Sequence, residues 1–99
     1  MSAYLVSNFA ITDRAGYQLY LQQVRQTLVD HGVEVLVVDY ASEVIEGTAA
    51  PVTVVMRFSS KEAAKRWHES TEYQAIIHHR LDNTERGFGV LCEGFNSPT

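Results

Sequence analysis

The chain has 99 residues, a mass of 11.1 kDa and a formal net charge of −4, because twelve acidic side chains outnumber eight Lys and Arg. This balance disfavours a nucleic-acid binder, since contacts to phosphates need clustered positive charge. The hydrophobic fraction of 45% is typical of a globular protein and excludes a disordered chain. We therefore expect a single domain over residues 1–99 and no nucleic acid as a partner.

The sequence carries no feature of a membrane or secreted protein. Its apolar runs are all shorter than the roughly 20 residues of a membrane-spanning helix. The N-terminal sequence MSAYLVSNFA lacks the basic start and the long apolar core of a signal peptide. Cys92 is the only cysteine, so an internal disulfide is impossible. We therefore expect a cytoplasmic protein without membrane association.

The first third of the chain predicts a strand followed by one long helix. Residues 3–11 are rich in β-formers and almost continuously apolar, as in a strand covered on both faces. Thr12 and Asp13 then offer side-chain oxygens that can cap a helix, and Gly32 is suited to end it. Between them an apolar stripe recurs with helical spacing. The stripe consists of Tyr17, Tyr20, Leu21, Val24 and Leu28.

The middle of the chain predicts two strands. Residues 33–40 are rich in β-branched side chains, and residues 43–46 are expected to continue this second strand beyond a bulge. Residues 47–51 predict a turn. Residues 52–58 then predict a third strand, because every even position is apolar while the odd positions are mixed.

A second helical region follows the third strand. Ser59 and Glu62 match the capping-box pattern that opens a helix. Trp67 belongs to the apolar stripe of that helix, the pattern breaks near Ser70, and it restarts through residues 73–81.

Residues 87–95 predict the last strand, whose glycines permit a bulge, and residues 96–99 are expected to be frayed. The order is then β-α-β-β-α-β. Right-handed crossovers fold this order into the ferredoxin-like α+β sandwich. That fold is a four-stranded antiparallel sheet with both helices on one face and with the first and third strands in the middle.

The predicted strands are apolar on both faces, although helices can cover only one. The apolar strand residues include Leu5, Phe9, Leu36, Val38, Val55 and Leu91. An exposed apolar patch of several hundred Å2 is either an interface or an aggregation hazard. We therefore expect a homodimer whose two sheets pack face to face. The alternative is a monomer whose open face is only moderately apolar.

A set of short motifs occurs in a fixed order along nearly the whole chain. They are Thr12-Asp13, Tyr17 and Tyr20, Glu46-Gly47, Phe58 before Ser59-Ser60, Ala63-Ala64, Trp67, Ser70, Glu72-Tyr73-Gln74, Arg80 and Glu93-Gly94. The most specific stretch is Trp67-x-x-Ser70-x-x-Tyr73. In this order the motifs resemble the family called domain of unknown function 1330, within the dimeric α+β barrel superfamily.

The resemblance implies a ferredoxin-like protomer and a dimer with a shared barrel, but no particular reaction. Relatives in the wider superfamily include cofactor-free monooxygenases, small isomerases and haem-handling enzymes, and analogy at this level transfers poorly. Many family members carry a glycine pair near the end of the second strand, where this chain has Asp39-Tyr40-Ala41. A family site at that strand end is therefore not assured here.

The histidines do not predict a metal site. Two metal-binding histidines on one helix usually stand four residues apart, whereas His68, His78 and His79 are spaced by ten and one. Adjacent histidines also point about 100° apart on a helix. We therefore expect no metal and no cofactor. Cys92, with no base nearby in sequence, is expected to be an inert thiol.

Tyr20, Trp67, His79 and Arg80 are candidates to shape a ligand pocket, with Tyr17 and Tyr73 as further aromatic walls. The alternative for these aromatic residues is plain core packing. Arg80 could anchor an anion, because a guanidinium fork suits a carboxylate. Its alternative role is a structural salt bridge, to Glu72 or to a carboxylate at a strand end.

A second group of polar residues falls on the two central strands. Asn8, or its neighbour Ser7, could form a buried polar cluster with Arg57 inside the dimer barrel. Asp39 on the second strand is the expected ion partner of Arg57. The alternative is a cluster that polarises a substrate.

Two kinds of function fit these residues. In the first, an enzyme transforms a small, partly aromatic or carboxylated metabolite by isomerase-like proton transfer or by cofactor-independent, monooxygenase-like oxygenation, with Asn8 or Arg57 polarising an oxygen. In the second, the homodimer is a non-catalytic ligand-binding or interaction protein.

Overall fold

The computed structural model describes residues 2–95, so the expectation for residues 96–99 lies outside the described part of the chain. Its elements are β1 (Ala3–Ile11), α1 (Arg14–Asp30), β2 (Glu34–Asp39), β3 (Val52–Phe58), α2 (Lys61–Glu69), α3 (Thr71–Gln74), α4 (Ile77–Leu81) and β4 (Thr84–Glu93). The predicted order is confirmed, with the second helical region divided into three pieces.

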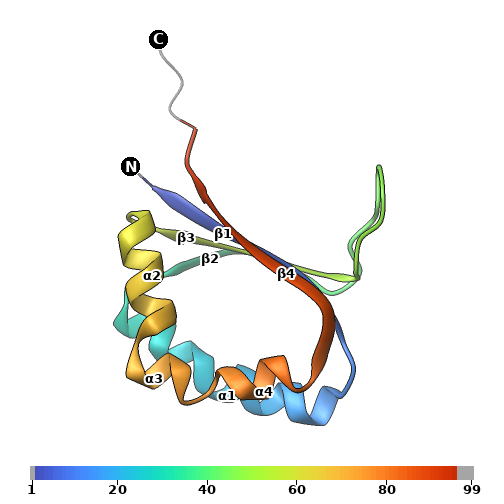
Figure 1. The fold of residues 1–99 in the computed structure, drawn as a ribbon, viewed down its shortest axis with the longest axis horizontal. Helices are drawn as coiled ribbons and strands as arrows, with labels where there is room; N and C mark the ends of the chain where they lie inside the picture. The colour runs from blue at the N-terminus through green and yellow to red at the C-terminus, as the bar shows by residue number, and fades with distance from the viewer. Residues whose placement is uncertain (1, 96–99) are drawn as a thin grey trace.

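The four strands form one antiparallel sheet in the order β2-β3-β1-β4. The first and third strands therefore lie in the middle, as predicted. All four helices lie on the same side of the sheet, and no helix of residues 2–95 covers the other side (Figure 1). The architecture is the predicted ferredoxin-like α+β fold.

Short polar side chains set the ends of the helices. Asp13 caps α1 as predicted, because its carboxylate accepts hydrogen bonds from the backbone amides of Ala15 and Gly16 at 3.0 and 3.2 Å. Gly32 ends that helix with a φ of 64°, a left-handed conformation that glycine adopts without strain.

The expected capping box at Ser59 and Glu62 is wrong by one residue. Ser60 is the cap of α2, and its hydroxyl accepts a hydrogen bond from the amide of Ala63 at 3.0 Å. Both serines suit a cap equally well, so the pattern alone chose the wrong one. Ser70 breaks the helical region with an extended ψ of 150° and caps α3, as the interrupted pattern predicted.

Two strand boundaries differ from the prediction. Residues 43–46 are not a strand, because the carboxylate of Asp39 accepts a hydrogen bond from the amide of Ala41 at 2.8 Å and turns the chain out of the sheet. Residues 40–51 then form a long loop that projects beyond the sheet (Figure 1).

The last strand starts three residues earlier than expected, at Thr84, and contains the predicted bulge. The left-handed residue at this bulge is Arg86, with a φ of 54°, and not a glycine. Gly87 is the next residue and packs closely against Phe9, because a Cβ added at Gly87 would lie 3.1 Å from the Phe9 Cβ.

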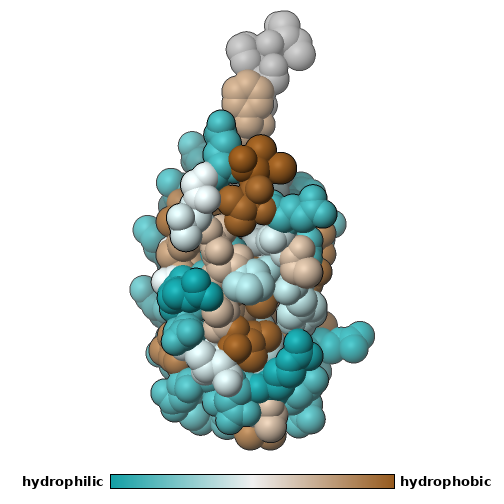
Figure 2. Space-filling view, turned by 90° about the vertical axis from the view of Figure 1, so that its right-hand side faces the viewer, coloured by the Kyte–Doolittle hydropathy of each residue, from teal (hydrophilic) through white to brown (hydrophobic). Residues whose placement is uncertain are grey.

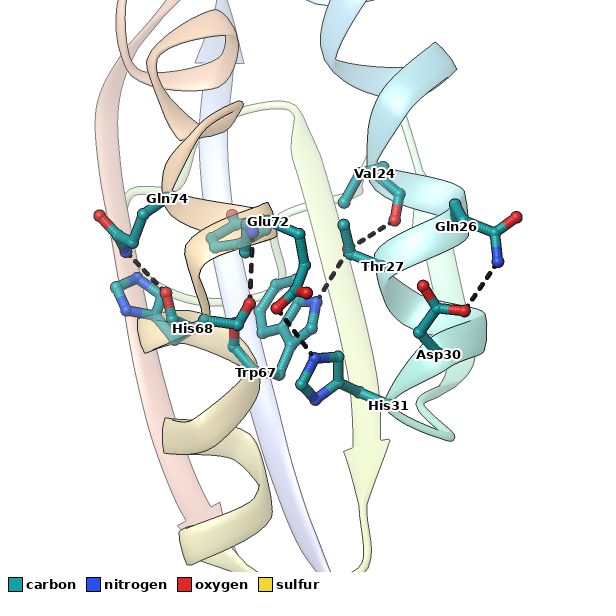
Figure 3. A network of polar contacts seen from close by, with 11 residues as sticks. Val24, Gln26, Thr27, Asp30, His31, Trp67, His68, Glu72 and Gln74 are labelled. Atoms are coloured by element: carbon teal, nitrogen blue, oxygen red, sulfur yellow. Dashed lines mark hydrogen bonds and ion pairs between the residues drawn. The ribbon is translucent and has the colours of Figure 1, made fainter.

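The core lies between the sheet and the helices and is largely aromatic. Trp67 and Tyr73 are almost fully buried, and their ring centroids lie 4.0 Å apart. The indole N–H of Trp67 donates a hydrogen bond to the hydroxyl of Thr27 at 3.0 Å, and that hydroxyl donates to the carbonyl of Val24 at 2.7 Å. Trp67 therefore ties α2 to α1 (Figure 3).

The helix-free face of the sheet has an apolar centre. The strand register places Val6 directly opposite Val55 on one side and opposite Val90 on the other. At the sheet edge, every residue of β2 is exposed, including four consecutive aliphatic side chains at residues 35–38. The expectation of apolar side chains on both faces is thus confirmed.

Replacing Thr27 with Val should destabilise the protein, because the buried indole N–H of Trp67 would lose its acceptor. An unsatisfied buried donor costs about 1–3 kcal/mol. We expect the free energy of unfolding to fall by that amount in a urea titration followed by Trp67 fluorescence. Thr27→Ser keeps the hydroxyl and is the control. Equal losses in the two variants would show that the hydrogen bond does not matter.

Candidate functional site

A cavity of about 620 Å3 lies between the sheet and the helices. Side chains from all four strands and from α1, α2, α3 and α4 line it, and most of them are aliphatic or aromatic. This volume is within the roughly 300–1,000 Å3 range of small-molecule sites.

Four aromatic residues form one wall of the cavity. Tyr17 and Tyr20 stand one turn apart on α1, with ring centroids 5.7 Å apart, and the ring of Tyr73 lies 6.2 Å from that of Tyr20. Trp67 continues the row beyond Tyr73. These residues are therefore part of the core and also part of the cavity lining.

The hydroxyls of Tyr20 and Tyr73 form a buried hydrogen bond of 2.8 Å. One hydroxyl must donate and the other accept, so one O–H of the pair remains to donate elsewhere. Burial, with Tyr73 close by, raises the pKa of Tyr20. Burial is also the main cause that raises the pKa of Tyr17 to about 12, with Tyr40 adding to the shift and Arg80 opposing it. Both residues are therefore neutral hydrogen-bond donors at ordinary pH.

Arg80 is the charged group that the structure places among these tyrosines. Its guanidinium carbon lies 5.9 Å from the ring centroid of Tyr20, and the side chain lines the cavity. Burial lowers the pKa of Arg80, but the phenolic oxygens of Tyr73 and Tyr20 outweigh that effect, so the pKa is raised overall. Arg80 therefore stays charged.

The alternative salt bridge from Arg80 to Glu72 is wrong. Glu72 instead lies 3.4 Å from His31, which projects from the end of α1 (Figure 3). Within residues 2–95, no carboxylate of the chain lies within 4.0 Å of the Arg80 guanidinium. The cation is thus available for an anion from outside the chain.

The structure places His79 beside the cavity-lining Arg80 but outside the cavity lining. Its ring lies against that of His78 at a centroid distance of 4.0 Å, with the two planes tilted by 41°. Among the described residues, no three His, Cys, Asp or Glu side chains are grouped so that they could hold a metal ion.

Asn8 lies on the sheet face away from the helices and does not join the other candidates. Its amide nitrogen donates to the carbonyls of Ala50 and Val52 at 3.0 and 2.9 Å and to the Thr53 hydroxyl at 3.1 Å. Its amide oxygen accepts from the Ala50 N–H at 2.9 Å. The hydrogen bonds of the Asn8 side chain thus anchor the end of the projecting loop.

Arg57 lies on the same face as Asn8, four residues further along the paired strand, or roughly 13 Å away. The expected ion pair with Asp39 is wrong. The strand register puts Glu34, not Asp39, opposite Arg57, and the two side chains lie 3.4 Å apart. Both are about half exposed, so this pair contributes little to stability.

Sequence reasoning did not assign several polar or charged residues to the cavity, among them Ser7 and Arg25. Ser7 was considered for a cluster with Arg57, but its pairing with Val54 and Gly89 turns it toward the cavity, whereas Arg57 lies on the other face. Arg25 of α1 also lines the cavity, although its side chain is exposed. The only sequence signal for Arg25 is its place next to the apolar stripe.

A family model described as a domain of unknown function, DUF1330, matches residues 2–95. The chain belongs to the DUF1330 family. Among curated protein sequences, none matches it. The suspected resemblance is therefore confirmed, and it carries no established activity with it.

Solved structures share the fold of this DUF1330 protein at low sequence identity. RPA0582, a protein of unknown function from Rhodopseudomonas palustris, has a TM-score of 0.81 at 11% identity, over 97% of this chain and 84% of that one. A candidate antibiotic biosynthesis monooxygenase from Caulobacter crescentus has a TM-score of 0.68 at 10% identity, over 96% and 91%.

A third neighbour is described as a dimeric protein of unknown function with a ferredoxin-like fold, from Bacteroides fragilis. It has a TM-score of 0.58 at 12% identity, over 94% of this chain and 96% of that one. At these identities the likeness shows the fold alone. Within residues 2–95, the helices of the DUF1330 protein are all too short or too polar to cross a membrane.

The raised tyrosine pKa values predict a loss of stability in alkali. In the unfolded chain tyrosines ionise near pH 10. The folded state keeps Tyr17 protonated up to about pH 12. Its contribution to stability is therefore complete below pH 10 and is lost as the pH rises toward 12. Urea midpoints at pH 9, 10 and 11 should fall, and Tyr17→Phe should make that fall shallower. Tyr4→Phe, outside the cavity, is the control; a shallower fall in that variant alone would contradict the assignment.

Proposed function

We propose that this DUF1330 protein is a homodimer that binds a small, mainly apolar metabolite, partly aromatic or carboxylated, in the cavity between sheet and helices. The observation that carries the proposal is the cavity itself, with a charged arginine among aromatic walls. Ligand sites are typically concave and mostly apolar, with a few placed polar groups that orient the ligand. Tyr20, Trp67 and Arg80 meet this description.

The first candidate function is an enzyme that transforms the bound molecule, and the alternative is a protein that binds it without turnover. The Tyr20–Tyr73 hydroxyl pair is the group best placed to exchange a proton with a ligand, because both tyrosines line the cavity and one O–H of the pair remains to donate. The fold neighbour described as a candidate monooxygenase favours oxygenation as the reaction class.

The dimer is supported by the apolar centre of the helix-free face. Covering apolar surface stabilises an association by roughly 25 cal/mol per Å2 before the costs of association. Val37 and Val90 are 41% and 47% exposed in the single chain, and Phe88 is 55% exposed. Figure 2 views the molecule from the right-hand side of Figure 1 and shows separate brown hydrophobic patches on a largely polar surface. A second sheet packed on the helix-free face would bury Val37, Val90 and Phe88, and one fold neighbour is described as dimeric.

The dimer proposal predicts a sedimentation mass of twice 11.1 kDa at micromolar concentration. Val55→Glu places a charge at the centre of the proposed interface and should shift the mass to that of a monomer, since an unpaired buried charge is strongly unfavourable. Gln22→Glu, on the exposed side of α1, is the matched control and should stay dimeric. A wild-type protein that sediments as a monomer would refute the dimer.

The binding proposal can be tested with the protein's only tryptophan. Trp67 lines the cavity, so a bound molecule should change its fluorescence. We expect a thermal-shift screen of small aromatic and carboxylated compounds to give hits whose affinity falls at least tenfold in Ser7→Phe, which fills the cavity. Gln22→Phe is the surface control.

Turnover assays on those hits then separate an enzyme from a binding protein. Oxygen consumption or an isomerised product would support catalysis, and binding without either would support the non-catalytic alternative. Hits whose affinity is unchanged by Ser7→Phe would place the ligand elsewhere and contradict the proposed site.

A further inference from the structure

The charges that line the cavity point to an anionic ligand. Arg80 and Arg25 are its permanent cations, Glu85 is its carboxylate, and His68 is its fourth titratable polar group besides the tyrosines. Arg25, His68 and Glu85 are exposed, so water screens them, whereas Arg80 is partly buried. A buried charge is costly unless an opposite charge accompanies it. Arg80 is therefore the charged group that a bound anion would stabilise most.

The donors around Arg80 fit one carboxylate better than a larger anion. The guanidinium offers a planar fork that matches the two oxygens of a carboxylate. The Tyr20–Tyr73 pair has one O–H left to donate, and Arg80 lies over the Tyr20 ring at 5.9 Å. Tyr17 is neutral on the same side of the cavity. One cation and a small number of neutral donors balance a single negative charge.

The rest of the cavity fits an aromatic body. The centroid distances of 5.7, 6.2 and 4.0 Å along Tyr17, Tyr20, Tyr73 and Trp67 form a continuous aromatic wall. Aliphatic side chains of β3 form the opposite side, including Val54 and Met56. Aromatic rings prefer tilted or edge contacts with other rings at such spacings, and these contacts add to simple burial.

We infer that the cavity takes an aromatic monocarboxylate, with its carboxylate on Arg80 and the remaining O–H of the Tyr20–Tyr73 pair and its ring along the wall that ends at Trp67. This inference rests on the proposed function, since it needs the cavity to bind a small molecule. It adds the charge of the ligand, the shape of its body and the residue that selects it.

The test compares 4-phenylbutyrate with 4-phenylbutanol, which has the same ring and chain but no charge. Trp67 fluorescence follows both titrations. In the wild type the acid should bind at least tenfold more tightly than the alcohol, which corresponds to about 1.4 kcal/mol. Octanoate, an acid without a ring, should bind more weakly than 4-phenylbutyrate.

The variants identify the selecting residue. Arg80→Gln should reduce the affinity for the acid to that for the alcohol and leave the alcohol unchanged. Arg25→Gln removes the other arginine that lines the cavity and tests it as the alternative anion site. Arg66→Gln removes an exposed arginine of α2 outside the cavity and is the matched control, with an expected change below threefold. If Arg80→Gln does not fold, the comparison of acid, alcohol and octanoate on the wild type still decides whether the cavity selects an aromatic carboxylate, and Arg80→Lys, which keeps the charge, replaces it in the comparison of variants.

The outcomes separate this inference from the proposal on which it depends. Equal binding of acid and alcohol, tighter binding of octanoate, or a loss of selectivity in Arg25→Gln instead of Arg80→Gln would overturn the inference while leaving a working cavity. Failure of all three probes to change Trp67 fluorescence, together with no hits in the wider screen, would overturn the proposed function itself.

Discussion

The packing of one layer of large aromatic side chains between the sheet and the helices determines the rest of the structure. Two buried hydrogen bonds fix that layer, from the Trp67 indole to Thr27 and between the hydroxyls of Tyr20 and Tyr73. Each bond joins α1 to the second helical region, so the helices hold one another at a fixed distance above the strands. A chain of about 100 residues has little interior to spare, and here the space between sheet and helices includes a cavity of about 620 Å3.

This layer also explains why a cation can remain inside a small domain. The aromatic faces and phenolic oxygens around Arg80 replace part of the water that a guanidinium loses on burial. They do not neutralise its charge. The anion site that we propose therefore uses the same residues that build the core, so that stability and the proposed binding would depend on the same side chains.

The fold was predictable because its signals are local and repeated. The bounds of β1 and β3 follow from their apolar patterns alone, and Asp13 and Gly32 mark the ends of α1. The errors occur where two residues offer the same chemistry or where a side chain bends the backbone. Ser59 and Ser60 are equivalent as caps in sequence. The Ala41 amide donates a hydrogen bond to the Asp39 carboxylate where the second strand ends, and the hydrophobic periodicity of the sequence carries no sign of this bond.

The site was less predictable, because it depends on which face of the sheet each residue takes. Tyr20, Trp67 and Arg80 carry helical spacing and were identified together. Asn8 and Arg57 were expected as a second polar group inside the dimer barrel that could act on the same ligand, and the register turns both away from the helices and the cavity. The register also makes Glu34, rather than Asp39, the ion partner of Arg57. A one-residue difference in pairing would reverse these faces.

The most direct test of the proposed dimer and of its ligand site is a crystal structure of the protein grown with 4-phenylbutyrate. We expect two copies joined through their helix-free sheet faces, with ligand density between sheet and helices and the ligand carboxylate against Arg80. A collapsed cavity in which Arg80 pairs with a carboxylate of the protein, or ligand density only outside that space, would contradict it.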